Sequence, residues 1–375
     1  MGKSSNFNPQ HENFYTRLGL EEIASSVEIK RAFFNAVKVY PPEKDQENHK
    51  LIREAYDTLI HSISKSEYDT KIQFGSVLDD LEKNLQDSVE AENIDEQINI
   101  LKKILNLAPD LGIYRNKLGN AFMEKEQFGY AYNQFKKAHN IDSENLVYIL
   151  NMGHAETERG NYVEAEKHFI QAWDLDREDN SAPRALASLY FEKLNRKRKA
   201  HNILDEAIEA DAKVDFQDFF CIYDKVHFYA LDKNQAGLKR ELERIKDVSS
   251  KKEEKEFASF MLYRTGGQLF DLKIFDLAIH FLKTANILMP EDSDIEEFYK
   301  QCLTDSERIK SFEKLADSDD IHKLVKSLVG LYLGRYYKEI DDQEFHRETE
   351  EWKDILINIM DTSPDCDEVK ESLRY

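Results

Sequence analysis

A constant offset of 34 residues relates two segments of this chain, and it constrains the fold more than any other feature. At that offset the segments share a glycine, two alanines and a phenylalanine: Gly119 and Gly153, Ala131 and Ala165, Ala138 and Ala172, Phe135 and Phe169. Self-similarity at a fixed period of this size is typical of stacked supersecondary repeats. Small residues let the two helices of a hairpin approach, and we expect the aromatic ring to fill the gap to the next hairpin. The offset therefore predicts a solenoid of helical hairpins.

The pattern continues in both directions with more substitutions. Upstream, residues 94–108 predict one helix that ends at Ala108 and Pro109. Downstream the same theme returns after a one-residue insertion, in Ala187, Tyr190, Ala200, Leu204 and Ala207. Residues 214–248 predict a degenerate helical pair whose first helix is rich in aromatic residues. A clearer repeat then follows in Gly266, Ala278, Leu282, Ala285 and Pro290.

Composition favours an all-α chain. Glycine (13) and proline (7) are scarce, and β-hairpins and bulges consume both. We predict a polar tail at 1–11, a helical module at 12–73, a helical connector at 74–92, the repeat solenoid at 93–292 and a helical cap at 293–375. Within the cap, helices are expected at about 294–314, 320–339 and 343–360, because the terminal units of solenoids are usually atypical.

The repeat pattern resembles that of tetratricopeptide proteins. Some members hold a peptide's C-terminal carboxylate with a clamp of lysine and asparagine side chains in the groove lined by the first helix of each pair. Asn120 and Asn151 stand at the two clamp asparagine positions, whereas Asn116, Ser181 and Ala185 replace the basic ones. Arg115, Lys117 and Arg184 lie nearby in sequence and would supply charge. The resemblance predicts a peptide-binding groove, and ordinary polar lining of an exposed groove is the alternative.

The first seventy residues predict a separate helical module. A short turn of helix at Phe14 and Tyr15 is followed by Ser25 and Ser26, which offer N-cap oxygens. Apolar residues at three-four spacing then predict a helix that ends at Pro41-Pro42, because proline lacks a donor and disfavours helix before it. A second amphipathic helix is expected from about Glu47, and a brief one begins at residues 65–69.

This module resembles the J-domain of co-chaperones. The residues that carry the resemblance are Phe14, Tyr15, Leu18, Gly19, Ile29, Lys30, Arg31, Ala32, Phe33, Tyr40, Glu54, Ala55, Tyr56, Leu59, Tyr68 and Asp69. The family carries His-Pro-Asp in the loop after its second helix, and that tripeptide drives ATP hydrolysis in a DnaK-type chaperone. Here the aligned residues are Pro41, Pro42 and Glu43. The resemblance therefore implies a module that stimulates a chaperone poorly or not at all. Lys30, Arg31 and Lys38 are candidate chaperone-docking residues, or else a solvated basic face.

Charge and motifs exclude several functions. The net charge is -21, and residues 1–72 carry ten basic and eleven acidic residues, so the acidity lies almost wholly in the rest of the chain. Such a chain repels nucleic acid and anionic membranes. No phosphate loop, nucleophile motif or metal-ligand spacing occurs, so we expect no enzyme activity, no cofactor and no metal. Three scattered cysteines, together with no leader and no membrane span, predict a soluble cytoplasmic protein.

These observations favour a non-enzymatic adaptor that binds proteins or peptides, with a J-like module unable to stimulate a DnaK-type ATPase. The alternative is an active co-chaperone that recruits a DnaK-type chaperone to clients held by the repeats. An enzyme with catalytic groups on the solenoid is a third hypothesis, which no motif requires.

Overall fold

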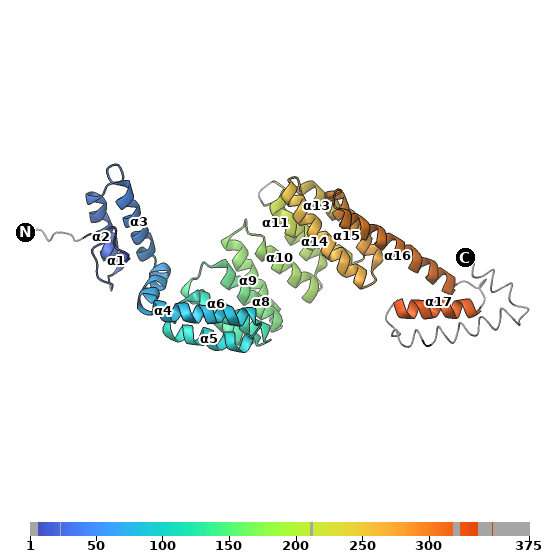
Figure 1. Ribbon diagram of the computed structural model, residues 1–375, viewed down its shortest axis with the longest axis horizontal. Helices are drawn as coiled ribbons and strands as arrows, with labels where there is room; N and C mark the ends of the chain where they lie inside the picture. Colours follow the sequence, from blue (N-terminus) through green and yellow to red (C-terminus); the bar gives the residue numbers. More distant parts are fainter. Residues whose placement is uncertain (1–6, 23, 211–212, 318–322, 337–346, 348–375) are drawn as a thin grey trace, which may run out of the picture. The chain divides into compact units, whose positions relative to one another are not determined.

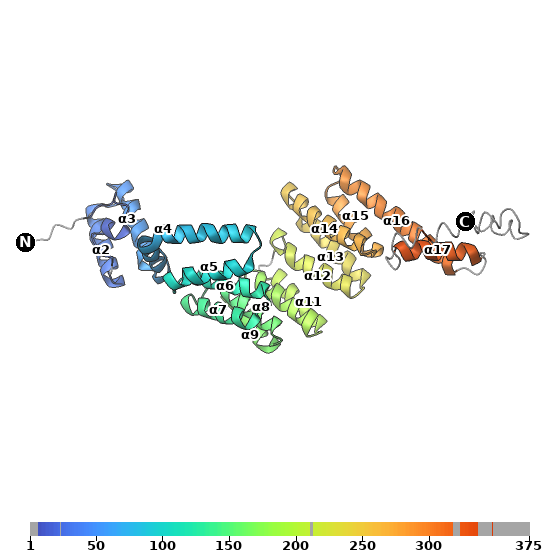
Figure 2. The ribbon, with the colours of Figure 1, turned by 60° about the horizontal axis from the view of Figure 1, so that its bottom comes forward.

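The computed structural model describes residues 7–22, 24–210, 213–317, 323–336 and 347. Within these residues every regular element is a helix and none is a strand, which confirms the predicted all-α class. The chain divides into two compact units, residues 1–210 and 211–375. Figures 1 and 2 show each unit as a succession of helices in which chain neighbours lie side by side.

Three helices form most of the N-terminal module: α1 (Phe14–Arg17), α2 (Ser26–Val39) and α3 (Gln46–Ile60). Ser25 caps α2 as predicted, because its hydroxyl accepts from the Glu28 amide while the Glu28 carboxylate accepts from the Ser25 amide. The apolar stripes of the helices meet in a core whose fully buried members are Tyr15, Leu18, Ile29, Ala36, Ile52, Ala55 and Leu59. The three-four spacing seen in the sequence thus builds one small core.

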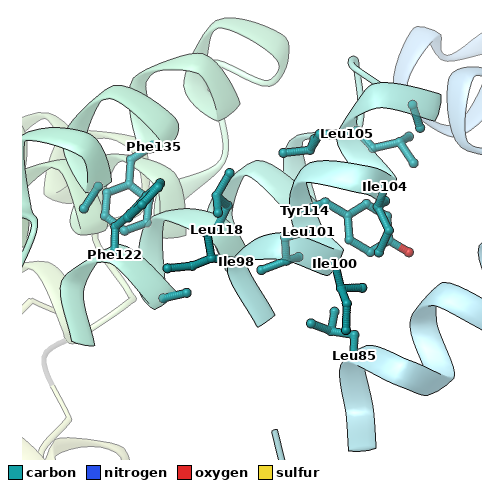
Figure 3. Packing of buried hydrophobic residues seen from close by; sticks show 14 of the residues in the cluster. Leu85, Ile98, Ile100, Leu101, Ile104, Leu105, Tyr114, Leu118, Phe122 and Phe135 are labelled. Atoms are coloured by element: carbon teal, nitrogen blue, oxygen red, sulfur yellow. The ribbon is translucent and has the colours of Figure 1, made fainter. Parts of the chain in front are cut away.

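The fourth helix is not brief, as the sequence had led us to expect. Helix α4 (Ser62–Glu90) has 29 residues and continues through the predicted connector. Its first turns contact α1 through Tyr68 and Asp69. Its later residues Leu78 and Leu85 join the core that α5 (Ile94–Leu107) forms with the next helices. Figure 3 shows Leu85 of α4 directed at Ile100 of α5. One helix therefore belongs both to the N-terminal module and to the first hairpin.

Six helical hairpins follow one another in the described part of the chain. After α4/α5 come α6 (Gly112–Glu124) with α7 (Phe128–Ile141), and α8 (Leu146–Glu158) with α9 (Tyr162–Leu175). The fourth hairpin pairs α10 (Ser181–Ser188) and the π-helix η1 (Leu189–Lys193) with α11 (Lys197–Ile208). The second unit adds α12 (Phe219–Leu231) with α13 (Gln235–Val248), and α14 (Lys252–Asp271) with α15 (Phe275–Leu288).

The same turn closes all six hairpins. One residue in each turn has the left-handed backbone conformation: Glu92, Glu126, Gly160, Asn195, Lys233 and Lys273. The amide of the next residue donates to a carbonyl in the last turn of the first helix, as Gln127 does to Phe122 and Asn161 to Glu156, both at 2.8 Å. This bond satisfies an orphan carbonyl at the helix end. The recurring turn confirms that the chain is built of repeated hairpins.

Close contact between glycine and phenylalanine explains the 34-residue pattern. A Cβ added to Gly119 would lie 2.3 Å from the Phe135 ring, and one added to Gly153 would lie 2.4 Å from the Phe169 ring. Both phenylalanines are 1 % exposed. Each ring therefore covers the glycine of its own hairpin. Phe135 also belongs to the core that includes Met152 and Ala155 of the next hairpin, as expected for a ring between hairpins. Figure 3 shows Phe135 beside Phe122 of the facing helix.

The π-helix accommodates the predicted one-residue insertion. In the fourth hairpin the closing bond runs from the Arg196 amide to the Tyr190 carbonyl, across six residues, whereas it spans five in the hairpins before it. A π-helical turn holds one residue more than an α-helical turn. The extra residue is thus absorbed before the turn, and Ala187 and Leu204 keep their repeat positions with full burial.

The second unit departs further from the pattern. Glu241 of α13 is fully buried and pairs with Lys225 of α12 at 3.5 Å, with Arg240 at 2.8 Å and with Arg244 at 3.0 Å. After α15 come α16 (Ser293–Asp317) and α17 (Lys323–Tyr336), which lie where two cap helices were expected. The helix expected at 343–360 lies outside the described residues, apart from residue 347.

Candidate protein-binding site

The candidate chaperone-docking residues lie together on the outer face of α2. Lys30, Arg31 and Lys38 are all exposed, while Ile29 and Ala36 of the same helix are buried in the module's core. Helical periodicity separates the two sets, because residues three and four apart share a face. The module therefore presents a basic helix face to solvent.

The residues at the degenerate tripeptide form a turn between α2 and α3. The Pro41 carbonyl accepts from the amides of Lys44 (3.0 Å) and Asp45 (2.9 Å). Pro42 and Glu43 are exposed at its tip. The Asp45 carboxylate caps α3 by accepting from the Asn48 amide. Pro41 offers neither a side-chain donor nor an amide, so this turn lacks the donor that an imidazole would supply.

A tyrosine–aspartate contact fastens α1 to α4. The Tyr15 hydroxyl donates to Asp69 (2.6 Å), and Lys65 pairs with the same carboxylate (2.8 Å). Burial and, to a smaller extent, the hydrogen bond to Asp69 together raise the pKa of Tyr15 to about 12. Phe14 stacks on Tyr68 with ring centroids 4.4 Å apart. Tyr68 and Asp69, two residues that carry the J-domain resemblance, therefore hold α1 against the first turns of α4.

A groove of about 850 Å³ lies among α4, α5 and α6. Lys117 and Asn120 of α6 line one wall, and both are exposed. The remaining lining residues mix apolar, amide and acidic side chains: Glu82, Leu85, Gln86, Val89, Glu92, Ile94, Gln97, Leu101, Ala121 and Glu124. The structure thus brings two of the five predicted groove residues into one concave site.

The other three predicted residues have different surroundings. The Asn151 side-chain amide donates to Asn116 at 2.8 Å, which joins α8 to α6. The Arg115 guanidinium donates to the Pro109 carbonyl (2.9 Å from Nε) in the turn before its own helix. Arg184 is half-buried on α10. None of these three lines the groove of Lys117 and Asn120.

Sequence reasoning missed the acidic side of the groove. Glu82, Glu92 and Glu124 line it together with a single lysine, Lys117, so the lining carries a net negative charge. The Tyr114 hydroxyl donates to Glu82, and burial together with this contact raises the pKa of Tyr114 well above its usual range. The signal was present, since Glu82 lies 34 residues before Asn116. Glu82 falls outside the predicted groove because the predicted repeats begin only at residue 93.

The described residues hold no group of three or more histidine, cysteine, aspartate or glutamate side chains that could bind a metal ion. Across the same part of the chain, no helix combines the length and the apolar composition needed to cross a membrane.

Comparison with known families identifies the N-terminal module. Residues 13–69 match the family model of the DnaJ domain. This part of the chain is a DnaJ domain. It comprises α1, α2, α3 and the first turns of α4, so the match ends within α4, which continues into the first hairpin. The search of curated proteins found no match to this chain.

Solved structures similar to the chain include several tetratricopeptide proteins. The Arabidopsis OM64 TPR domain is 22 % identical, with 31 % of this chain and 97 % of that chain covered and a TM-score of 0.29. A tetratricopeptide repeat protein from Parabacteroides merdae is 12 % identical over 74 % of this chain and 98 % of its own, with a TM-score of 0.41. The P58(IPK) TPR domain is 13 % identical over 78 % and 83 %, with a TM-score of 0.32. The repeat assignment itself rests on the 34-residue register and on the recurring turn.

Proposed function

We propose that this protein is a non-enzymatic adaptor whose DnaJ domain does not stimulate the ATPase of a DnaK-type chaperone. The turn at Pro41, Pro42 and Glu43 carries this proposal. The domain keeps its core and its Tyr15–Asp69 contact, so its fold does not depend on the altered tripeptide. What the turn lacks is an imidazole donor at residue 41. The DnaJ domain thus keeps its fold while the turn that drives ATP hydrolysis in the family is altered. This combination supports a binding role.

The repeats supply the second half of the adaptor. We place the partner segment in the groove of α4, α5 and α6, where the Asn120 amide can both donate to and accept from an extended backbone. Glu82, Glu92 and Glu124 disfavour a bare carboxylate there and favour a segment with a cationic or apolar side chain. Because α4 also forms part of the DnaJ domain, the partner would be bound on the helix that connects the DnaJ domain to the repeats.

Restoring the His-Pro-Asp tripeptide tests whether the altered turn is what prevents the DnaJ domain from stimulating an ATPase. The double variant Pro41→His/Glu43→Asp should gain severalfold stimulation of a DnaK-type ATPase in steady-state assays, whereas the natural chain should give none. Pro41→Ala/Glu43→Ala is the matched control and should give no stimulation of the ATPase. Severalfold stimulation by the natural chain would contradict the proposal.

Blocking the groove tests the repeats. Asn120→Arg places a long cationic side chain in the groove, and Asn140→Arg makes the same change at an exposed position of α7. Quantitative capture from a native lysate should show partners that are lost with Asn120→Arg and kept with Asn140→Arg. An identical set of captured proteins for both variants would remove the groove from the proposal.

An active co-chaperone is the second candidate, and the exposed face of Lys30, Arg31 and Lys38 favours it. On this hypothesis the natural chain stimulates the ATPase, and replacing the three residues by alanine abolishes that stimulation. For either function we propose a cytoplasmic location. Cys302 is buried and forms no disulfide in the described part of the chain, as expected in a reducing compartment.

A further inference from the structure

A run of basic residues interrupts the acidic chain at the fourth hairpin. Between residues 193 and 204 there are five cations and no acid: Lys193, Arg196, Lys197, Arg198 and Lys199. The whole chain has a net charge of -21, so without these five residues it would carry -26. We call these five residues the basic patch.

The patch contributes four of its five residues to one hollow. It spans the end of η1, the turn and the first turn of α11. Arg196, Lys197, Arg198 and Lys199, together with Asn195 and Asn202, line a hollow of about 780 Å³. Each of these six side chains carries N–H donors, and no carboxylate lines the hollow. The surface is therefore suited to an anionic group.

Neighbouring contacts orient part of the patch without burying it. Lys199 pairs with Glu166 at 2.9 Å and lies 4.0 Å from the centroid of the Tyr190 ring, while the Tyr190 hydroxyl donates to the same carboxylate. Lys193 approaches Glu158 at 3.9 Å. The Lys199 side chain remains 47 % exposed and that of Arg196 54 %. These cations are thus positioned by the fold and still reach solvent.

The fold does not require cations at these positions. The preceding hairpins close the same turn with other residues at the five equivalent positions: Glu158, Asn161, Tyr162, Val163 and Glu164 in α8/α9, and Glu124, Gln127, Phe128, Gly129 and Tyr130 in α6/α7. Those sets carry net charges of -2 and -1, against +5 in the patch. A structural role common to the repeats therefore cannot account for the charge.

We propose that the basic patch binds a short acidic segment, rich in aspartate and glutamate, of a partner protein. Arginine and lysine donors pair with carboxylates in charge-assisted hydrogen bonds. The basic patch is flanked by acidic residues in the sequence, since Glu192 precedes it and Asp205 and Glu206 follow it. A long polyanion such as a nucleic acid would extend over this acidic surface and be repelled, whereas a short peptide stays within the hollow. This surface is separate from the groove of Asn120, so the two sites can be tested independently.

Binding of fluorescein-labelled octaglutamate to the full chain tests the proposal by fluorescence anisotropy. Lys197→Glu/Arg198→Glu should weaken binding about tenfold or more, because two attractive charges become repulsive. Lys136→Glu/Lys137→Glu makes the same net change at two exposed lysines of α7 and should leave the affinity within about twofold. Raising the salt from about 50 to about 200 mM should weaken binding of octaglutamate to the natural chain.

Four results would overturn the proposal. Octaglutamate could fail to bind at low salt, or it could bind the patch variant as well as the natural chain. Its binding could be lost with Asn120→Arg, which would place the peptide in the groove. Finally, a single-stranded oligothymidylate of equal charge could bind more tightly than octaglutamate in a patch-dependent way, which would make the patch a nucleic-acid surface. Circular dichroism of each variant shows whether its helices are intact.

Discussion

The α8/α9 hairpin and the α12/α13 hairpin both pack an aromatic ring against a glycine of the facing helix, but in opposite orders. In α8/α9 the glycine is on the first helix and the ring on the second, and a Cβ on Gly153 would lie 2.4 Å from Phe169. In α12/α13 the ring is on the first helix, and a Cβ on Gly237 of the second would lie 2.4 Å from Tyr229. Close approach is thus preserved although the residues exchange places. The hairpin geometry, and not one residue order, is the repeated unit.

The two hairpins differ more in what else they bury. The α8/α9 interior is apolar around Ala165, Phe169 and Ala172, and its one strongly buried carboxylate, Glu156, pairs with Arg159 at the end of α8. The α12/α13 interior contains Lys225 (1 % exposed) and Glu241 (0 %), with Arg240 and Arg244 closing the ion cluster from outside. A buried charge requires a partner, and removing one partner leaves the other uncompensated. The irregular hairpin should therefore be more sensitive to a single polar substitution than the regular one.

The largest effect is expected from Glu241→Gln. Removing the carboxylate takes away the negative charge that Glu241 places beside Lys225, Arg240 and Arg244 in a buried cluster, and should cost about 3–5 kcal/mol. Hydrogen exchange of α12 and α13 in the full chain should accelerate, while exchange of α8 and α9 stays unchanged. Glu243→Gln, at an exposed side chain of the same helix, is the matched control and should have little effect. Equal protection in both variants would mean that the ion cluster does not stabilise this hairpin.

Gly153→Ala should have the next largest effect. The added methyl group would overlap the fully buried Phe169 ring, and overpacking of this kind costs about 1–3 kcal/mol. Gly129→Ala, where nothing lies within 4 Å of the new methyl group, should instead stabilise α7 by up to about 1 kcal/mol through helix propensity. Hydrogen exchange of α8 and α9 should accelerate in Gly153→Ala, whereas hydrogen exchange of α7 should slow in Gly129→Ala. A stabilising Gly153→Ala would show that the ring can move aside.

The smallest effect is a pH dependence of the fourth hairpin. Burial opposes ionisation of Glu166, but hydrogen bonds from Tyr190 and Lys199 outweigh it and hold the pKa of this carboxyl below 4.5. A depressed folded-state pKa adds stability above the unfolded value, and that stability is lost as the pH falls through the folded pKa. Protection of α11 should therefore decrease below about pH 4.5 by an amount on the order of 1 kcal/mol. Glu166→Gln should remove this dependence, and an unchanged pH profile in that variant would assign it to other groups.

Much of the fold could be predicted from local spacing. Helices α2, α3 and α5 fall where Ser25, apolar periodicity and the prolines placed them, because these signals act within a few residues, whereas α4 is longer than predicted. The groove was predicted less well. Lys117 and Asn120 line it together, but Asn151 contacts Asn116 and Arg115 contacts Pro109, because each side chain finds the nearest partner that its own helix packing presents. Repeat register locates a residue along its helix but does not determine which neighbour it meets.

The amino-acid sequence by itself determined the hairpin repeat, the all-α class and the altered turn at Pro41, since each depends on residues close in the chain or on a constant offset. Only the tertiary structure decided that α4 serves both the DnaJ domain and the first hairpin, because helix continuity there depends on packing at both ends. The tertiary structure also decided that η1 absorbs the inserted residue and that Glu241 is buried among three cations. These features arise from contacts between helices, which a linear pattern of residues does not specify.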